Sequence, residues 1–322
     1  SWRKVLDHFA DAKVLGVTAT PDRADERAMG QVFESEAFVY EIDDAIRDGW
    51  LSPIHVVPVY VESIDFSKCR KVAGDLSASD LEAVIAQEEA LHGIAKATVE
   101  VSGGRRTLMF TPGVESAHRL AEIMSRYQPG YARAIDGGME FQERRRILAA
   151  HQRGEFPCLT NCAIATEGYD DPRIECISMA RPTMSRSLYA QMVGRGLRPG
   201  KPVCTVIEFT GNSGKHRLSS CADILGGKYD EAVVDAAAKK VASGKVQNPA
   251  EALEQAKAEL EAARLAELSA RQRITADVRY RTGRIDPFAV LHIQEPDEAW
   301  ARRFGGKPAS DKQVAALKKW GV

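Results

Sequence analysis

Two arginines, Arg195 and Arg198, lie three residues apart in the segment YAQMVGRGLRPG at positions 189–200. In a helix, this spacing places both guanidinium groups on one face. A guanidinium is a permanently charged, planar fork that matches the oxygens of a phosphate. The pair therefore favours a phosphate-binding role, although an isolated Arg-x-x-Arg pair is more often a solvated helix end.

The chain contains no loop of its own for gripping a nucleotide phosphate. No segment matches GxxxxGK[ST], the pattern of a phosphate-binding loop. The segments GNSGKH (211–216) and RPGKP (198–202) contain a Gly-Lys pair but lack the first glycine at the required distance. We interpret these two segments as turns, so the arginines would have to act on a phosphate that is held elsewhere.

Two further segments end apolar runs with small or hydroxylated residues. TATPDR (18–23) follows one run and FTPG (110–113) follows another. A helical pattern begins directly after FTPG, and a helix N-terminus there would offer free N–H groups to an anion such as a backbone phosphate. Each segment taken alone is as consistent with an ordinary turn.

The segment TEGYDDP (166–172) follows the apolar run FPCLTN (156–161). Gly168 permits close approach of a ligand to the backbone, because glycine has no side chain. Asp170 can accept hydrogen bonds from the hydroxyl groups of a sugar. Gly, Asp and Pro also form turns without any ligand, which is the alternative interpretation.

The order of these segments resembles the superfamily 2 helicases and translocases. TATP, FTPG, TEGYDDP and QMVGRGLR are similar to motifs III, IV, V and VI of that superfamily, in the same order and at workable spacing. The segment ARPTMSRSLYAQMVGRGLRPGK (180–201) is most similar to the subgroup of repair helicases, restriction-enzyme motor subunits and phage helicases. The similarity covers about residues 1–225.

The resemblance implies two RecA-like lobes that clamp ATP and Mg²⁺ between them, with nucleic acid, DNA in this subgroup, lying across both lobes. Arg195 and Arg198 would be arginine fingers. They would reach from the second lobe to the γ-phosphate held by the first lobe and stabilise the charge of the transition state. Gln191 would help to position this phosphate or the attacking water.

The resemblance also implies roles for the other candidate residues. The expected nucleotide contacts are Glu167, Gly168 and Asp170. The expected contacts with the nucleic-acid backbone are Thr111, Pro112, Asn161 and Thr166, and the residues expected to couple hydrolysis to movement are Thr18 and Thr20. Cys162 stands where many relatives carry a motif V threonine, so Asn161 or Thr166 would take that role here.

The elements that must position these residues alternate between strands and helices, which predicts an α/β fold with a mostly parallel sheet. The segment with the two arginines is apolar and precedes a strand, so we expect it at the edge formed by the carboxyl ends of the strands, where open α/β sheets bind ligands. The predicted strands span 14–20, 53–61, 107–111, 131–136, 156–161, 176–180 and 203–209. The predicted helices span 81–101, 113–127, 139–155, 250–273 and 310–320.

The predicted organisation has four parts. Residues 1–30 would be the end of the first RecA-like lobe, and residues 31–227 the second lobe. Residues 228–273 would form a helical accessory region, and residues 274–322 a tail with a terminal helix. Because the phosphate-binding loop would belong to the first lobe, we expect this chain alone to hydrolyse essentially no ATP.

The amino-acid composition says little about which ligand the protein binds, but it does indicate a cellular compartment. The 322 residues carry a formal net charge of −1, which gives no overall evidence for nucleic-acid binding. The six cysteines form no CxxC pair and the histidines add no zinc spacing, so we expect no metal site. Buried free thiols suit a reducing compartment, and no apolar run reaches the length of a membrane span, so we expect a cytoplasmic protein. The first residue is serine, so we expect the chain to belong to a longer protein.

Two other functions remain open at this point. The chain could be a helicase-like docking module for nucleic acid or protein that has no ATPase activity. It could also be part of the motor subunit of a restriction-type nuclease, although residues 228–322 show no nuclease-like carboxylate cluster. The arginine pair argues against the docking module, because such a module has no need of side chains aimed at ATP.

Overall fold

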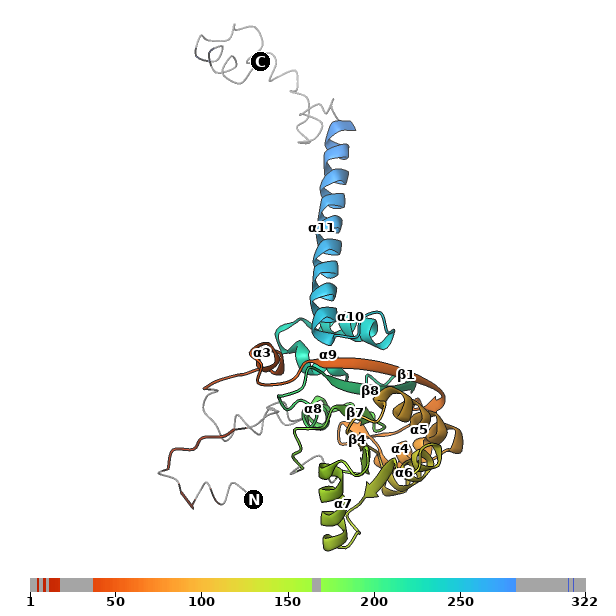
Figure 1. The fold of residues 1–322 in the computed structure, drawn as a ribbon. Helices are drawn as coiled ribbons and strands as arrows, with labels where there is room; N and C mark the ends of the chain where they lie inside the picture. Colours follow the sequence, from red (N-terminus) through yellow and green to blue (C-terminus); the bar gives the residue numbers. More distant parts are fainter. Residues whose placement is uncertain are drawn as a thin grey trace. The chain divides into compact units, whose positions relative to one another are not determined.

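The computed structural model places residues 1–260 and residues 261–322 in two compact units. The residues that it describes are 5, 8–9, 12–17, 37–163, 169–281, 312 and 315, with the backbone alone for 268–281. Figure 1 shows these residues in colour. The candidate residues Thr18, Thr20, Thr166, Glu167 and Gly168 lie outside the described residues, and so does nearly all of the predicted terminal helix.

A six-stranded sheet forms the centre of the first unit, and every pair of neighbouring strands is parallel (Figure 1). The strand order is β1-β8-β7-β4-β6-β5. Strands β4, β6 and β7 are buried along their whole length, as expected for strands covered on both faces. The strands are β1 (Ile54–Asp65), β4 (Thr107–Phe110), β5 (Ala132–Ile135), β6 (Cys158–Asn161), β7 (Cys176–Met179) and β8 (Cys204–Asn212), and a separate hairpin pairs β2 (Lys71–Val72) with β3 (Asp75–Leu76).

Helices cover both faces of this sheet. Apolar residues of α4, α5 and α6 form one hydrophobic core with one face, and those of α7, α8, α9 and α10 form a second core with the other. The predicted α/β fold with a parallel sheet flanked by helices is therefore confirmed. The helices are α3 (Ile42–Arg47), α4 (Ala78–Ile85), α5 (Glu88–Ser102), α6 (Val114–Tyr127), α7 (Phe141–Arg153), α8 (Arg186–Gly194), α9 (Cys221–Leu225), α10 (Glu231–Ala242) and α11 (Pro249–Arg281), with a 3₁₀ turn at Gly226–Lys228.

The prediction of one helix over 81–101 was wrong, because two helices, α4 and α5, occupy this stretch. The chain turns at Gln87, whose ψ of 138° is extended rather than helical. Breaking the helix removes the hydrogen-bond partner of the Ala86 carbonyl, and the Nη1 of Arg119 replaces it at 3.0 Å. A contact from α6 thus stabilises a break that the helical periodicity of the sequence does not reveal.

The predicted strand over 14–20 does not form in the part that the structure describes. Residues 14–17 have no regular secondary structure, and the side chains of Val14, Leu15 and Val17 are exposed. A strand needs neighbours to satisfy its backbone N–H and C=O groups. The six strands of the sheet leave this segment unpaired, so its apolar sequence alone does not make it a strand.

The end of the first unit adds two helices to the core that contains α7 and α8. Val234 and Val241 of α10 are buried there, and so are Leu253 and Ala256 at the beginning of α11. The turn after Ala242 and the start of α11 at Pro249 separate the two helices, and Gly244 takes a φ of +70°, which favours glycine.

All six cysteines are free thiols, and five of them are buried, whereas Cys162 is partly exposed. Among the helices of the described ranges, none is both long and apolar enough to cross a membrane.

Candidate functional site

The loop with the two arginines lies at the amino edge of the sheet, not at the carboxyl edge as we predicted. Helix α8 starts after the carboxyl end of β7 and must run back across the sheet before parallel strand β8 can begin. The loop after α8 therefore reaches the beginning of β8. A hydrogen bond of 2.8 Å from Ser52 N to Leu197 O joins it to the residues before β1, and one of 2.8 Å from Cys204 N to Pro53 O joins the beginning of β8 to the same residues.

Both arginines contact the loop that follows β6. Arg195 donates from Nη1 to the carbonyl oxygen of Tyr169 at 3.1 Å, and Arg198 donates from Nε to Oδ1 of Asp170 at 2.7 Å. Helical spacing is not the reason, because α8 ends at Gly194 and Arg198 lies beyond its end. The structure thus brings together residues of the segments that resemble motifs V and VI. Gln191 lies one turn before Arg195 on α8 and is partly exposed.

A glycine allows the loop that carries Arg195 and Arg198 to pack directly on the sheet. Gly196 is buried, and a Cβ atom at this position would lie 2.5 Å from Sγ of Cys204 and 2.7 Å from Cγ1 of Ile177. No side chain larger than hydrogen fits at such distances unless the side chains of Cys204 and Ile177 move. Gly196 therefore fixes how closely the backbone between the two arginines approaches the sheet.

A partly buried glutamate anchors the helix that leads into this loop. Glu208 of β8 accepts a hydrogen bond from the hydroxyl of Tyr189 on α8, and its Oε1 accepts another from the N–H of Cys221 at 3.1 Å. Burial raises the pKa of Glu208 and also that of Tyr189. Our sequence reasoning missed this contact, although the one glutamate in the apolar strand sequence VCTVIEF was a signal for it.

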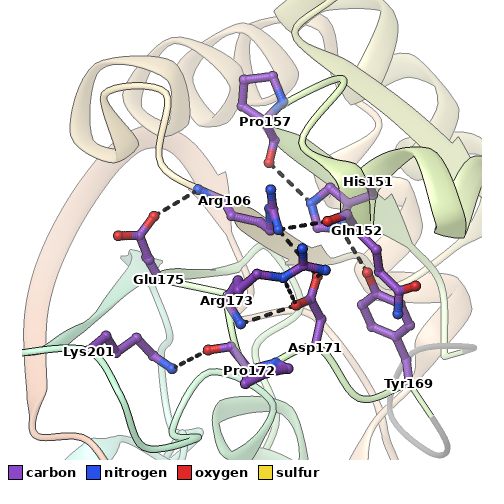
Figure 2. Close-up of polar contacts among 10 residues, drawn as sticks. All are labelled: Arg106, His151, Gln152, Pro157, Tyr169, Asp171, Pro172, Arg173, Glu175 and Lys201. Carbon is purple, nitrogen blue, oxygen red and sulfur yellow. Dashed lines mark hydrogen bonds and ion pairs between the residues drawn. The ribbon is translucent and has the colours of Figure 1, made fainter.

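Tyr169 is held from its other side by a buried histidine (Figure 2). Nε2 of His151 lies 3.2 Å from the carbonyl oxygen of Pro157, and Nδ1 lies 2.9 Å from the hydroxyl of Tyr169. A carbonyl can only accept, so Nε2 carries the proton and Nδ1 accepts from the tyrosine. Burial lowers the pKa of His151 from 6.5 to about 4, so this histidine is neutral at physiological pH.

The titration of His151 predicts a pH dependence of stability. Because its pKa is lower in the folded state than in the unfolded state, its contribution is present above pH 6.5 and is lost as the pH falls towards 4. The shift corresponds to about 3 kcal/mol. In urea unfolding, replacing His151 with glutamine should therefore give a smaller loss of stability between pH 6.5 and pH 4 than in the parent protein. Parallel stability curves for the two proteins would contradict this assignment.

The same loop contains a buried ion-pair cluster, which our sequence reasoning also missed (Figure 2). Asp171 is 1% exposed, and its Oδ1 accepts from Nε of Arg173 at 2.8 Å. Nη1 of Arg106, from the turn before β4, lies 3.6 Å from Oδ2 of the same carboxylate. The cluster fastens the loop that carries Tyr169 and Asp170 to the amino edge of the sheet.

The predicted nucleic-acid contacts that the structure describes, Thr111, Pro112 and Asn161, lie at the opposite, carboxyl edge, and they are buried. Thr111 is 1% exposed and donates its hydroxyl hydrogen to carbonyl oxygens of its own turn and of β6, namely Gly113 O at 2.8 Å and Asn161 O at 3.1 Å. Asn161 is fully buried and donates from Nδ2 to Met109 O at 2.9 Å. Pro112 is buried as well, and its carbonyl oxygen accepts from Sγ of Cys162 at 3.5 Å. In this conformation these side chains hold the edge of the sheet together.

The helix N-terminus at this edge is already occupied, which corrects the prediction of free N–H groups there. Glu82 of α4 places its carboxylate at the beginning of α6, where Oε1 accepts from Ser116 N at 2.7 Å and Oε2 accepts from Ser116 Oγ at 2.6 Å. A carboxylate is a favourable partner for the N-terminal end of a helix. An incoming phosphate would therefore have to compete with Glu82.

Part of the chain is similar in sequence to known proteins. Residues 86–200 match the family model described as "Helicase conserved C-terminal domain". The chain is 34% identical over 252 residues to a putative ATP-dependent helicase, IRC3, from Saccharomyces cerevisiae, covering 73% of this chain and 35% of the relative. It is 23% identical over 237 residues to a subunit of the type I restriction enzyme EcoAI endonuclease from Escherichia coli, covering 65% of this chain and 29% of the relative.

Similarity to solved structures is partial. A structure of S. cerevisiae Dbp5 bound to RNA and ADP BeF3 gives a TM-score of 0.37 at 14% identity, covering 59% of this chain and 42% of that chain. The chain spans about a third of the length of the curated relatives it matches. The family match includes strands β4, β6 and β7 and both arginines. Residues 86–200 are thus similar to the helicase conserved C-terminal domain, and this region contains the segments FTPG, TEGYDDP and QMVGRGLR.

Proposed function

We propose that this chain supplies the second motor lobe of a cytoplasmic ATP-dependent helicase or translocase that acts on DNA. The observation that carries the proposal is the meeting of Arg195 and Arg198 with Tyr169 and Asp170, 2.7 to 3.1 Å apart, in a region similar to the helicase conserved C-terminal domain. In this proposal residues 31–227 are the second lobe, and residues 1–30 belong to the first.

The arginines act as fingers across a cleft. Arg198 uses Nε for Asp170, and this ion pair is open to solvent, since the two side chains are 42% and 63% exposed. A γ-phosphate that reaches the terminal nitrogens of Arg198 would share the guanidinium with Asp170 or displace the carboxylate. Gln191, Glu167 and Gly168 would complete this side of the nucleotide site, whereas the first lobe would hold Mg²⁺ and grip the phosphates.

The nucleic-acid track crosses the carboxyl edge of the sheet. We assign the loop with Thr166 to direct contact with the DNA backbone, and Thr111, Pro112 and Asn161 to shaping the edge on which it lies. Two observations support a positioning role for the latter three, namely their burial and their internal hydrogen bonds. Thr18 and Thr20 would couple hydrolysis to movement. DNA is favoured because the sequence resembles the repair and restriction subgroup.

The proposal is tested by assaying this chain alone with Mg²⁺ and ATP, with and without single-stranded DNA. Arginine fingers stabilise charge on the phosphate, but without a phosphate-binding loop they do not hold the nucleotide. We therefore expect phosphate release no faster than in a sample without protein. A polypeptide that carries both lobes should hydrolyse ATP and do so faster with DNA. Robust turnover by this chain alone would overturn the assignment of the phosphate-binding loop to another lobe.

A further inference from the structure

A pocket with a volume of about 450 Å³ opens at the amino edge of the sheet. Its walls come from the turns that lead into strands β4, β6, β7 and β8. The volume lies in the range of about 300–1,000 Å³ that is typical of small-molecule sites. The pocket lies at the edge opposite the proposed DNA track, and the side chains of Arg195 and Arg198 do not line it.

Cationic side chains dominate the lining of the pocket. Arg106, Arg173 and Lys201 line it, together with one carboxylate, that of Glu175 (Figure 2). Asp171 lies behind the two arginines and is buried, so it neutralises part of their charge without entering the pocket. Three cations against two carboxylates leave a net positive charge at a concave surface, which suits an anionic ligand.

The two guanidinium groups are held in place before any ligand arrives. Arg106 donates from Nη1 to the carbonyl oxygen of Gln152 at 3.0 Å, and its side chain is 16% exposed. Arg173 donates from Nε and Nη2 to the two oxygens of Asp171, at 2.8 and 3.3 Å. A ligand would therefore not have to immobilise these side chains, which lowers the entropic cost of binding.

The ammonium group of Lys201 is likewise held by hydrogen bonds before a ligand binds. Its ammonium donates to Pro172 O at 3.0 Å and to Arg198 O at 2.6 Å, which leaves the third N–H of the ammonium for a ligand. Removal from water lowers the pKa of Lys201, and the nearby Arg198 contributes in the same direction. A bound anion would offset this cost by stabilising the charged ammonium.

Turns with glycine keep the pocket open. Gly104, Gly154 and Gly200 line it with φ values of +79°, +80° and +101°, a region of backbone conformation that favours glycine. At Gly154 a Cβ atom would lie 2.6 Å from Nη2 of Arg106, so a side chain there would displace the guanidinium from this position. The shape of the pocket therefore depends on residues that lack side chains.

We propose that this pocket binds a compact anion that carries two or more phosphate groups. Arginine forks and an ammonium are the donors that proteins use for phosphate oxygens. The volume exceeds what one phosphate needs, and the three cations come from separate turns, so a ligand with several phosphates can reach all of them. The site is distinct from the proposed ATP cleft. The proposal that it binds an anion therefore does not depend on the proposed motor function.

The test is calorimetric titration of this chain with tripolyphosphate at constant ionic strength. We expect saturable binding, and we expect Lys201→Met and Arg173→Met each to weaken it by at least about tenfold, because each removes a charge-assisted hydrogen bond. The matched control is Lys245→Met, which removes a lysine from an exposed turn between α10 and α11 and should leave the affinity unchanged. Far-UV circular dichroism shows whether each variant is folded.

Two further measurements distinguish this pocket from the proposed arginine fingers and from the proposed DNA track. Arg198→Ala should weaken tripolyphosphate binding less than Lys201→Met does, because the side chain of Arg198 does not line the pocket and acts on Lys201 through its charge alone. Single-stranded DNA without terminal phosphates should not displace tripolyphosphate. The proposal is overturned if no saturable binding occurs, if the pocket variants bind as well as the control, or if the DNA displaces the ligand.

Discussion

Replacing Arg195 with alanine is expected to lower the rate of ATP hydrolysis by a factor on the order of 10³ in a polypeptide that carries both motor lobes. A finger stabilises negative charge that develops on the transferred phosphoryl group, so its loss affects the transition state more than the bound substrate. We expect the same direction for Arg198→Ala. Binding of DNA should change little, because the DNA track is assigned to the opposite edge of the sheet.

Single-turnover kinetics with saturating ATP would measure this effect, and a DNA-binding titration would serve as the second readout. Arg198→Lys is informative because it keeps the positive charge but loses the planar fork, and we expect it to remain strongly impaired. The matched control is Arg126→Ala on α6, which removes an exposed arginine whose ion pair within the described part of the chain is with Glu122, one turn away. Normal turnover in the Arg195 variant would refute the finger assignment.

The sequence predicted the strands of the sheet well, because strands buried on both faces need apolar residues throughout. Runs such as TLMFT and CISMA correspond to β4 and β7 within one residue at their ends. The apolar run at 14–20 looks the same in sequence but has no neighbouring strand in the described part of the chain. Apolar composition therefore indicates the capacity to form a strand, whereas pairing decides whether one forms.

The loop that carries Arg195 and Arg198 shows that strand order decides at which edge of the sheet a motif lies. The sequence singled out Arg195 and Arg198 but placed them at the wrong edge, since we assumed that ligand-binding residues gather at the carboxyl ends of strands. Because the crossover from β7 to β8 is parallel, α8 must end near the beginning of β8. Arg195 and Arg198 then meet the loop at Tyr169 and Asp170, which crosses the sheet in the same direction on its way to β7.

The contacts that the sequence could not reveal are those between residues far apart in the chain. Glu82 occupies the N-terminus of α6 although it lies 34 residues before Ser116. Arg106 reaches Asp171 from the turn before a different strand. Neither contact follows from local spacing, because each depends on how the strand order brings separate turns to one edge. The internal bonds of Thr111 and Asn161 have the same origin.

The second large effect concerns stability. Replacing Asp171 with alanine is expected to lower the free energy of unfolding by about 3–5 kcal/mol, which is typical when one partner of a buried ion pair is removed. The Asp171 side chain is fully buried, and that of Arg106 is 16% exposed, so the variant would leave a largely buried guanidinium with no carboxylate. Arg173 is 56% exposed and can turn to solvent, so Arg106 accounts for most of the cost.

The adjacent residue provides a matched control for this experiment. Asp170→Ala removes the same side chain one position earlier, but the ion pair of Asp170 with Arg198 is exposed, so its loss should cost less than about 1 kcal/mol. Adding Arg106→Met to the Asp171→Ala variant removes the stranded charge and should recover part of the lost stability. Equal losses in urea unfolding for the two aspartate variants would show that burial of this pair does not govern stability. A double variant no more stable than Asp171→Ala would show that the stranded guanidinium is not the cause of the loss.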